Sequence, residues 1–189
     1  MLVLASASPR RLELLRRAGI ECEVQAADVA EDPLPGESAK DCAERLAHAK
    51  AMAIARKRPG DLVLGADTVV VIDGEILGKP RDGADAVRML RLLSGRTHRV
   101  ITGVCIVAGD GQMVGSESTA VTMAKISERE IADYVASGEP MDKAGAYAIQ
   151  GIASRWIPRI EGDYSNVVGL PVARVWRMLQ TAGLGFESS

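Results

Sequence analysis

One stretch, Leu62 to Ile72, constrains the fold of this chain more than any other. It is apolar and β-branched almost throughout, which predicts a buried central strand. A carboxylate inside such a run is costly to bury unless it is paired, hydrogen-bonded or placed where the strand borders a cleft. Asp67, in the middle of the run, is therefore either a structural residue that bonds a neighbouring turn or a functional one, and the rest of the chain must decide.

Strand and helix patterns alternate along the chain, which predicts an α/β fold. We expect a single domain over residues 1–189 with a mixed, bent β-sheet flanked by helices, forming two lobes around a cleft. The expected strands are 1–5, 20–25, 62–72, 75–77, 97–108, 113–125 and 154–160. Helices are expected after the caps Ser8, Ser38, Asp82 and Ser127, and over 171–179.

The overall composition excludes several classes of protein. The formal net charge is −2 and aromatic residues make up 3% of the chain, which argues against nucleic acid as a partner. No segment approaches the roughly 20 apolar residues of a membrane span. The cysteines, Cys22, Cys42 and Cys105, form no CxxC pair, which fits free thiols in a reducing compartment. We expect a cytoplasmic protein with no membrane partner.

The turn after the first strand has the composition of a phosphate-binding site. Ser8 is suited to cap a helix and Pro9 to be its first residue. Arg10 and Arg11 then fall in the first turn, where cations oppose the helix dipole unless an anion is bound. The alternative is a solvated arginine pair at a surface helix end. Because serine, proline and arginine cluster at a strand-to-helix turn, the phosphate interpretation is favoured.

Further charged residues extend this pattern. Lys50 lies on the apolar face of the helix after Ser38, where it either extends to solvent or reaches a phosphate. A tight turn at Asp73-Gly74 brings Lys79 back beside the Asp67 strand. Acidic groups such as Glu31, together with these cations, suggest phosphate chemistry with a divalent cation, since Mg²⁺ takes one or two carboxylates plus phosphate oxygens. The loop that contains Glu31 does not itself distinguish a ligand from a solvated charge.

Several motifs together resemble the Maf family of nucleoside triphosphate pyrophosphatases, in order and spacing from about Leu2 to Leu179. The motifs are Ser6-Ala7-Ser8-Pro9-Arg10-Arg11, Gly65-Ala66-Asp67-Thr68, Gly78-Lys79-Pro80-Arg81, residues 142–151 and Val168-Gly169-Leu170-Pro171. The resemblance implies a fold related to inosine triphosphate pyrophosphatases, with hydrolysis between the α- and β-phosphates and Mg²⁺ or Mn²⁺ as cofactor.

The resemblance also assigns roles to residues of this chain. Asp67 matches the family's general base, and Glu31 matches an acidic residue near the metal, which Asp67 would also contact. The residues that match phosphate-facing positions are Ser8, Arg10, Arg11, Lys50 and Lys79. A homodimer is a further expectation from the family.

Arg11, Thr68 and Gln150 match the positions by which the dTTP/UTP-preferring branch of the family is distinguished. A glutamine amide can donate to one edge atom of uracil or thymine while accepting from its N3–H. Modified pyrimidine triphosphates would then also be substrates, which fits a house-cleaning role. Two alternatives are a 7-methyl-GTP-preferring pyrophosphatase and a non-catalytic nucleotide-binding regulator of cell division.

Overall fold

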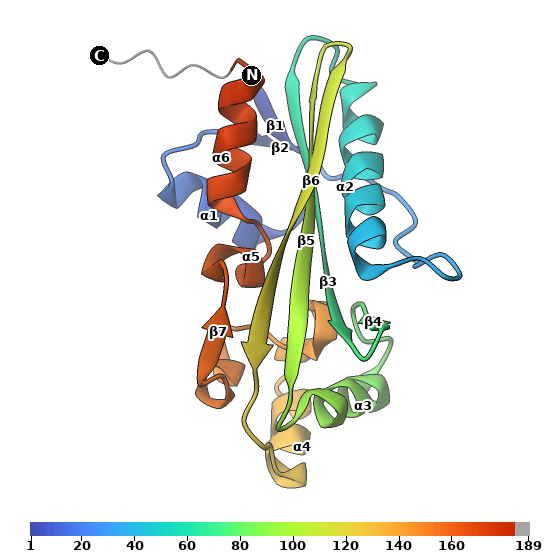
Figure 1. The fold of residues 1–189 in the computed structure, drawn as a ribbon, viewed down its shortest axis with the longest axis vertical. Coiled ribbons are helices and arrows are strands. Elements are labelled where there is room, and N and C mark those ends of the chain that lie inside the picture. Colours follow the sequence, from blue (N-terminus) through green and yellow to red (C-terminus); the bar gives the residue numbers. More distant parts are fainter. Residues whose placement is uncertain (184–189) are drawn as a thin grey trace.

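A twisted, mixed β-sheet forms the centre of the computed structural model, which describes residues 1–183 (Figure 1). The seven strands have the order β2-β1-β3-β5-β6-β7, and β4 pairs with β3 beyond this path. Their bounds are β1 (Leu2–Leu4), β2 (Glu23–Val24), β3 (Leu62–Ile72), β4 (Glu75–Leu77), β5 (Thr97–Ala108), β6 (Gly111–Thr122) and β7 (Arg159–Glu161). The expected α/β fold with a mixed sheet is confirmed.

Helices cover the sheet unequally. In Figure 1, α2 lies along one side of the long strands, α1 and α6 lie on the other, and α3 and α4 gather at one end. The helices are α1 (Pro9–Arg17), α2 (Ala39–Ala55), α3 (Gly83–Leu93), α4 (Glu128–Ala136), α5 (Tyr164–Val168) and α6 (Val172–Thr181). Three short 3₁₀ turns are η1 (Glu139–Asp142), η2 (Ala144–Ala146) and η3 (Ile152–Trp156). Within residues 1–183, no helix is long and apolar enough to cross a membrane.

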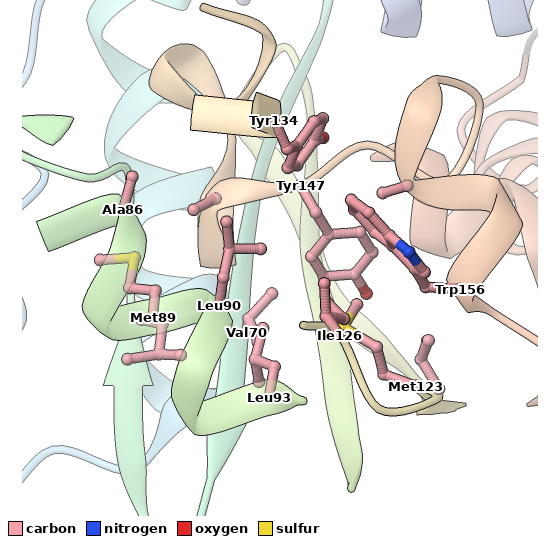
Figure 2. Close-up of a cluster of buried hydrophobic side chains, with 14 of the residues drawn as sticks. Val70, Ala86, Met89, Leu90, Leu93, Met123, Ile126, Tyr134, Tyr147 and Trp156 are labelled. Carbon is pink, nitrogen blue, oxygen red and sulfur yellow. The ribbon is translucent and has the colours of Figure 1, made fainter. Parts of the chain in front are cut away.

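Strand β3 runs between the two ends of the molecule. It pairs antiparallel with β5 over ten residues, and β5 pairs with β6 in a long hairpin. Near its start β3 packs with β1 and the helices α1 and α6, through Leu64 and Ala66. Near its end Val70 joins a second core, which includes Leu90 from α3, Tyr134 from α4 and Trp156 from η3 (Figure 2). The two lobes therefore have separate apolar cores, joined by β3 and by β5, which contributes Val100 to one core and Val104 to the other.

Local signals predicted most helix starts correctly. The Ser127 hydroxyl and the Glu130 side chain form the reciprocal capping box, and the Ser38 and Asp82 side chains each accept a hydrogen bond from a backbone N–H of the first turn. Ser8 holds the cap position of α1 in extended conformation, but its side chain makes no cap hydrogen bond. Its hydroxyl is therefore left for another partner.

The strand predicted over 154–160 is largely wrong. Residues Ile152–Trp156 form η3, and only Arg159–Glu161 pair with β6. The 3₁₀ turn is held by a contact distant in sequence, because the Ile152 N–H donates to the Glu139 carboxylate. The second strand predicted from sequence also shrinks, from residues 20–25 to Glu23–Val24, and the strand predicted to end at residue 125 ends at Thr122.

Candidate active site

An interruption in the sheet creates the site. Strands β1 and β4 pair with the same edge of β3, β1 at residues 62–64 and β4 at residues 70–72. Within the described part of the chain, residues 65–69 of β3 have no strand partner on that edge. Asp67 and Thr68 lie in this gap, just beyond the carboxyl end of β1, where ligands commonly bind in open α/β sheets.

A cavity of about 690 Å³ opens from this gap. One side, which we call the charged wall, consists of Ser8–Arg11, Glu31, Lys50, Asp67, Thr68 and Lys79. The other side, which we call the loop wall, is built by residues 142–152, of which 142–144 and 147–150 line the cavity. All nine residues predicted for the site therefore line one cavity, although they come from six separate parts of the chain.

Lys50 is the centre of the charged wall. Its Nζ lies 2.6 Å from Asp67 Oδ1 and 2.6 Å from Glu31 Oε1. The Lys50 side chain is 8% exposed and that of Asp67 is 10% exposed, so their pair is largely shielded from water. Of the two possibilities that the sequence left for Lys50, the inward orientation is confirmed.

Glu31 joins the ammonium groups of two lysines. Its Oε2 also lies 3.5 Å from Nζ of Lys79, on the exposed rim of the cavity. Partial burial raises the pKa of Glu31, but the hydrogen bond and the charge of Lys50, aided by Lys79, outweigh it and leave that pKa below its usual value. Glu31 is therefore ionised at neutral pH, and one loop carboxylate balances cations from α2 and from the segment after β4.

The position of Lys50 depends on two glycines that let α2 contact the sheet directly. A Cβ on Gly65 would lie 2.7 Å from the backbone N of Ala51, and one on Gly103 would lie 2.6 Å from that of Glu44. Gly103 is the register partner of Asp67 on β5. Because no side chain separates helix and sheet here, the residue before Ala51, Lys50, reaches a carboxylate on β3.

Arg11 is buried behind the cavity rather than extended across it. Its Nε donates to the Gly169 carbonyl at 2.7 Å, Nη1 to Ser6 Oγ at 3.0 Å and Nη2 to Thr68 Oγ1 at 3.0 Å. Burial lowers the pKa of Arg11, and the charge of Asp67 opposes that shift. A guanidinium has five N–H donors, so two remain for a ligand at the cavity surface.

A chain of buried polar groups continues from Thr68 through the sheet. Thr68 Oγ1 lies 2.9 Å from Thr102 Oγ1, its register partner on β5, and Thr102 donates to the Asn166 carbonyl at 3.2 Å. The Asn166 amide then donates to the Val100 carbonyl and to Thr119, each at 3.0 Å. The chain connects α5 to three strands and supports the Arg11–Thr68 contact from behind.

Three other residues of the charged wall have few partners for their hydrogen-bond donors. Ser8 Oγ has no hydrogen-bond partner among residues 1–183, and the only ion pair of Arg10 in that range is a long one, 3.7 Å from Asp142 Oδ2. Lys79 is exposed apart from its contact with Glu31. These groups lie at the surface of the cavity with donors to offer, as an anion-binding site requires.

The loop wall places Gln150 at the cavity with its side chain unpaired among residues 1–183. Behind it, Tyr147 Oη lies 2.7 Å from Nε2 of His98, and the two rings meet edge to face with centroids 5.4 Å apart. Burial raises the pKa of Tyr147 and lowers that of His98 to about 4, so both groups are neutral at pH 7. Behind Gln150 the loop wall is thus supported by a neutral hydrogen bond.

Several site residues were not found from the sequence. Thr102 and Asn166 support Thr68, and the only available signal was a threonine within the apolar run of β5. Ser6 lies in the Ser6–Arg11 motif, but its contact with Arg11 was not predicted. Arg45 pairs with Glu37 and is not among the residues that line the cavity. Among the described residues, no three His, Cys, Asp or Glu side chains form a cluster that could hold a metal ion.

Comparison with known proteins shows which proteins this chain is similar to. The model of the family described as Maf-like protein matches residues 1–182. A protein of Koribacter versatilis named dTTP/UTP pyrophosphatase is 58% identical over 97% of this chain and 95% of its own length. A protein of the same name from Geobacter metallireducens is 56% identical over 96% of each chain. The Staphylococcus aureus Ham1 protein matches 95% of this chain and 98% of its own with a TM-score of 0.53 and 14% identity, which shows a shared fold alone.

Proposed function

This chain belongs to the Maf family, and from that premise we propose that it hydrolyses dTTP and UTP to the nucleoside monophosphate and pyrophosphate. The relatives at 58% and 56% identity that carry the name dTTP/UTP pyrophosphatase support this substrate choice. We further infer that residues 1–189 are one domain, that the protein acts in the cytoplasm, and that it forms a homodimer.

One observation carries the proposal for the reaction: Lys50 holds Asp67 by a single oxygen. Oδ1 of Asp67 accepts from Lys50, whereas Oδ2 accepts no hydrogen bond from residues 1–183. In our proposal Oδ2 takes a proton from water as the water oxygen bonds to the α-phosphorus. The bond from that phosphorus to the oxygen bridging the β-phosphate breaks, and pyrophosphate leaves. Lys50 holds the carboxylate in position.

The remaining cations suit the charge of a triphosphate. We propose that Ser8, Arg10, Arg11, Lys50 and Lys79 contact phosphate oxygens. Arg10 and Lys79 have only long ion pairs to exchange, 3.7 Å and 3.5 Å, so a phosphate can replace these partners at little cost. Gln150, on the loop wall, would form hydrogen bonds with the edge of the pyrimidine. Thr68, held by Arg11, would lie beside the base.

A divalent cation fits the donor set, and we propose Mg²⁺ or Mn²⁺. Glu31 and Asp67 both accept from one ammonium group, so their oxygens already converge on a single positive charge. Two carboxylates plus substrate phosphate oxygens form the kind of ligand set that Mg²⁺ uses. Such an ion would neutralise charge that develops on the phosphates. We expect EDTA to abolish turnover and added Mg²⁺ or Mn²⁺ to restore it, whereas full activity in EDTA would contradict this cofactor.

The deciding experiment measures pyrophosphate release from a panel of triphosphates by the wild type and by Asp67→Asn. We expect dTTP and UTP to be preferred and the variant to be slower by at least about 100-fold, the loss typical of a missing general base. A circular dichroism spectrum and a urea melt of the variant check that it is folded. Preference for 7-methyl-GTP would overturn the substrate, and nucleotide binding without turnover in the wild type would favour a regulator.

A further inference from the structure

The turn that carries Gln150 is held at both ends by two residues from outside it. The Ala148 N–H donates to Tyr134 Oη at 3.3 Å, and the Ile152 N–H donates to Oε1 of Glu139 at 3.1 Å. Tyr134 Oη in turn donates to Glu139 Oε1 at 2.9 Å. The backbone two residues before Gln150 and two residues after it therefore connects to one tyrosine–glutamate pair, which we call the clamp.

The packing around the clamp leaves it little freedom. Tyr134 is 1% exposed, and its ring packs edge to face on Trp156 at 5.3 Å between centroids, within the apolar core of that lobe (Figure 2). A Cβ on Gly151 would lie 2.7 Å from Oε2 of Glu139, so the carboxylate occupies the space that any other residue at 151 would need. Within the turn, the Gly151 N–H donates to the Ala148 carbonyl at 3.1 Å.

Neither clamp residue lines the cavity, whereas Ala148, Ile149 and Gln150 do. The buried Tyr134 hydroxyl and the half-buried Glu139 carboxylate make their hydrogen bonds with each other and with this turn, although a 3₁₀ turn could form without them. A side-chain amide that must meet a base edge within hydrogen-bond distance benefits when its backbone is held in one position before binding.

We propose that Tyr134 and Glu139 are positioning residues for pyrimidine selection: they hold the turn so that the Gln150 amide meets the base edge in one register. The proposal rests on the proposed role of Gln150. It extends the specificity apparatus beyond the cavity to α4 and η1, elements that no phosphate-binding residue occupies.

The test compares kcat/KM for UTP with that for CTP, since cytosine lacks the N3–H that a glutamine carbonyl would accept. Tyr134→Phe keeps the ring and removes the hydroxyl, and Glu139→Ala removes the oxygens that accept from Tyr134 Oη and from the Ile152 N–H. We expect each to lower the UTP/CTP ratio by about five- to tenfold, the value of a lost hydrogen bond, and to leave inhibition by pyrophosphate unchanged. Glu128→Ala, at an exposed glutamate on α4, the helix that carries Tyr134, is the control and should match the wild type.

A double-mutant cycle separates positioning from general stability. If the clamp acts through Gln150, Tyr134→Phe should not lower the UTP/CTP ratio further in a Gln150→Ala background. An additional loss in that background would overturn the proposal for the clamp alone. So would an unchanged ratio in the single clamp variants if Gln150→Ala changes the ratio. An unchanged ratio in Gln150→Ala would overturn the role of Gln150 and the clamp with it, while the Asp67 test of hydrolysis stands apart.

Amide hydrogen exchange of the wild type supplies a test that does not depend on variants folding. The Ala148 and Ile152 amides should exchange at least about tenfold more slowly than the Gln150 backbone amide, which has no acceptor among residues 1–183, because the first two are bonded to the clamp. Exchange of all three amides at similar rates would show that the clamp does not hold the turn and would overturn the proposal.

Discussion

The two walls of the cavity are built by different chemistry. In the charged wall, Lys50 and Asp67 are opposite charges shielded from water, and Glu31 adds a second carboxylate at 2.6 Å. In the loop wall the supporting contacts are hydrogen bonds that Tyr134 and Glu139 accept from backbone N–H groups and the hydrogen bond between His98 and Tyr147. The ion pairs of the charged wall can exchange partners with a polyanion, whereas the contacts of the loop wall lie behind it and keep its shape. One cavity can therefore combine a wall whose ion pairs change partners when a ligand binds with a wall whose shape stays the same.

Among the tests of this difference between the walls, removing Lys50 should have the largest effect on stability. Lys50→Met would leave Asp67 as an uncompensated buried charge, and we expect the free energy of unfolding to fall by about 3 kcal/mol at pH 7. Urea denaturation measures this value. Adding Asp67→Asn to the variant should recover much of the loss, because it removes the stranded charge.

The matched control for this change is Lys40→Met, on the same helix. Lys40 is exposed and its contact with Glu44 is 3.9 Å long, so its removal should change stability very little. Equal losses for Lys40→Met and Lys50→Met would show that the charged wall is no more than a surface ion pair.

The loop wall should respond to pH through His98. The pKa of His98 is lowered by burial from 6.5 to about 4, so as pH falls the unfolded chain binds a proton before the folded one does. The stabilisation is present above about pH 6.5 and is lost as pH falls toward 4. Between pH 7.5 and 5 the wild type should lose about 2 kcal/mol more than His98→Gln, which does not titrate. Urea melts at both values measure the difference, and His48→Gln, at a partly exposed histidine, should behave like the wild type.

The smallest expected effect concerns the polar chain that joins the two regions. Thr102→Val removes one hydroxyl between Thr68 and Asn166, and we expect a loss of about 1 kcal/mol in stability with a modest rise in KM for dTTP. Thr122→Val, in the exposed pair with Thr97, is the matched control. No difference between the two variants would mean that the buried chain does not support Arg11.

The apolar and capping signals were sufficient to predict the framework of the site. The run around Asp67 identified the central strand, and helical spacing placed Lys50 on the inner face of its helix. What spacing alone left undecided was the partner of Lys50, because the contact with Asp67 requires α2 to touch the sheet at Gly65 and Gly103. Close approach of backbones is a tertiary property that a single glycine in a strand only suggests.

The sequence was least informative where distant contacts decide local structure. Residues 154–160 include the large apolar side chains Trp156, Ile157 and Ile160, as a strand can, yet Glu139 stabilises a 3₁₀ turn at Ile152. Tyr134 and His98 were likewise indistinguishable from ordinary core residues, since their roles depend on the backbone amide and the hydroxyl that they meet. Family resemblance grouped the residues that touch the cavity, and the structure adds those behind it.

The direct contact of α2 with β3 and β5 has a mechanical consequence. Where two backbones touch, no side-chain rotamer can adjust the spacing, so the backbone of α2 at Lys50 lies at a fixed distance from the strand that carries Asp67. Engineering that varies the side chains around the base or the phosphates can therefore leave this distance intact. A single methyl group at Gly65 or Gly103 would instead move α2 away from the sheet. It would disturb the geometry of the site without altering any reactive group.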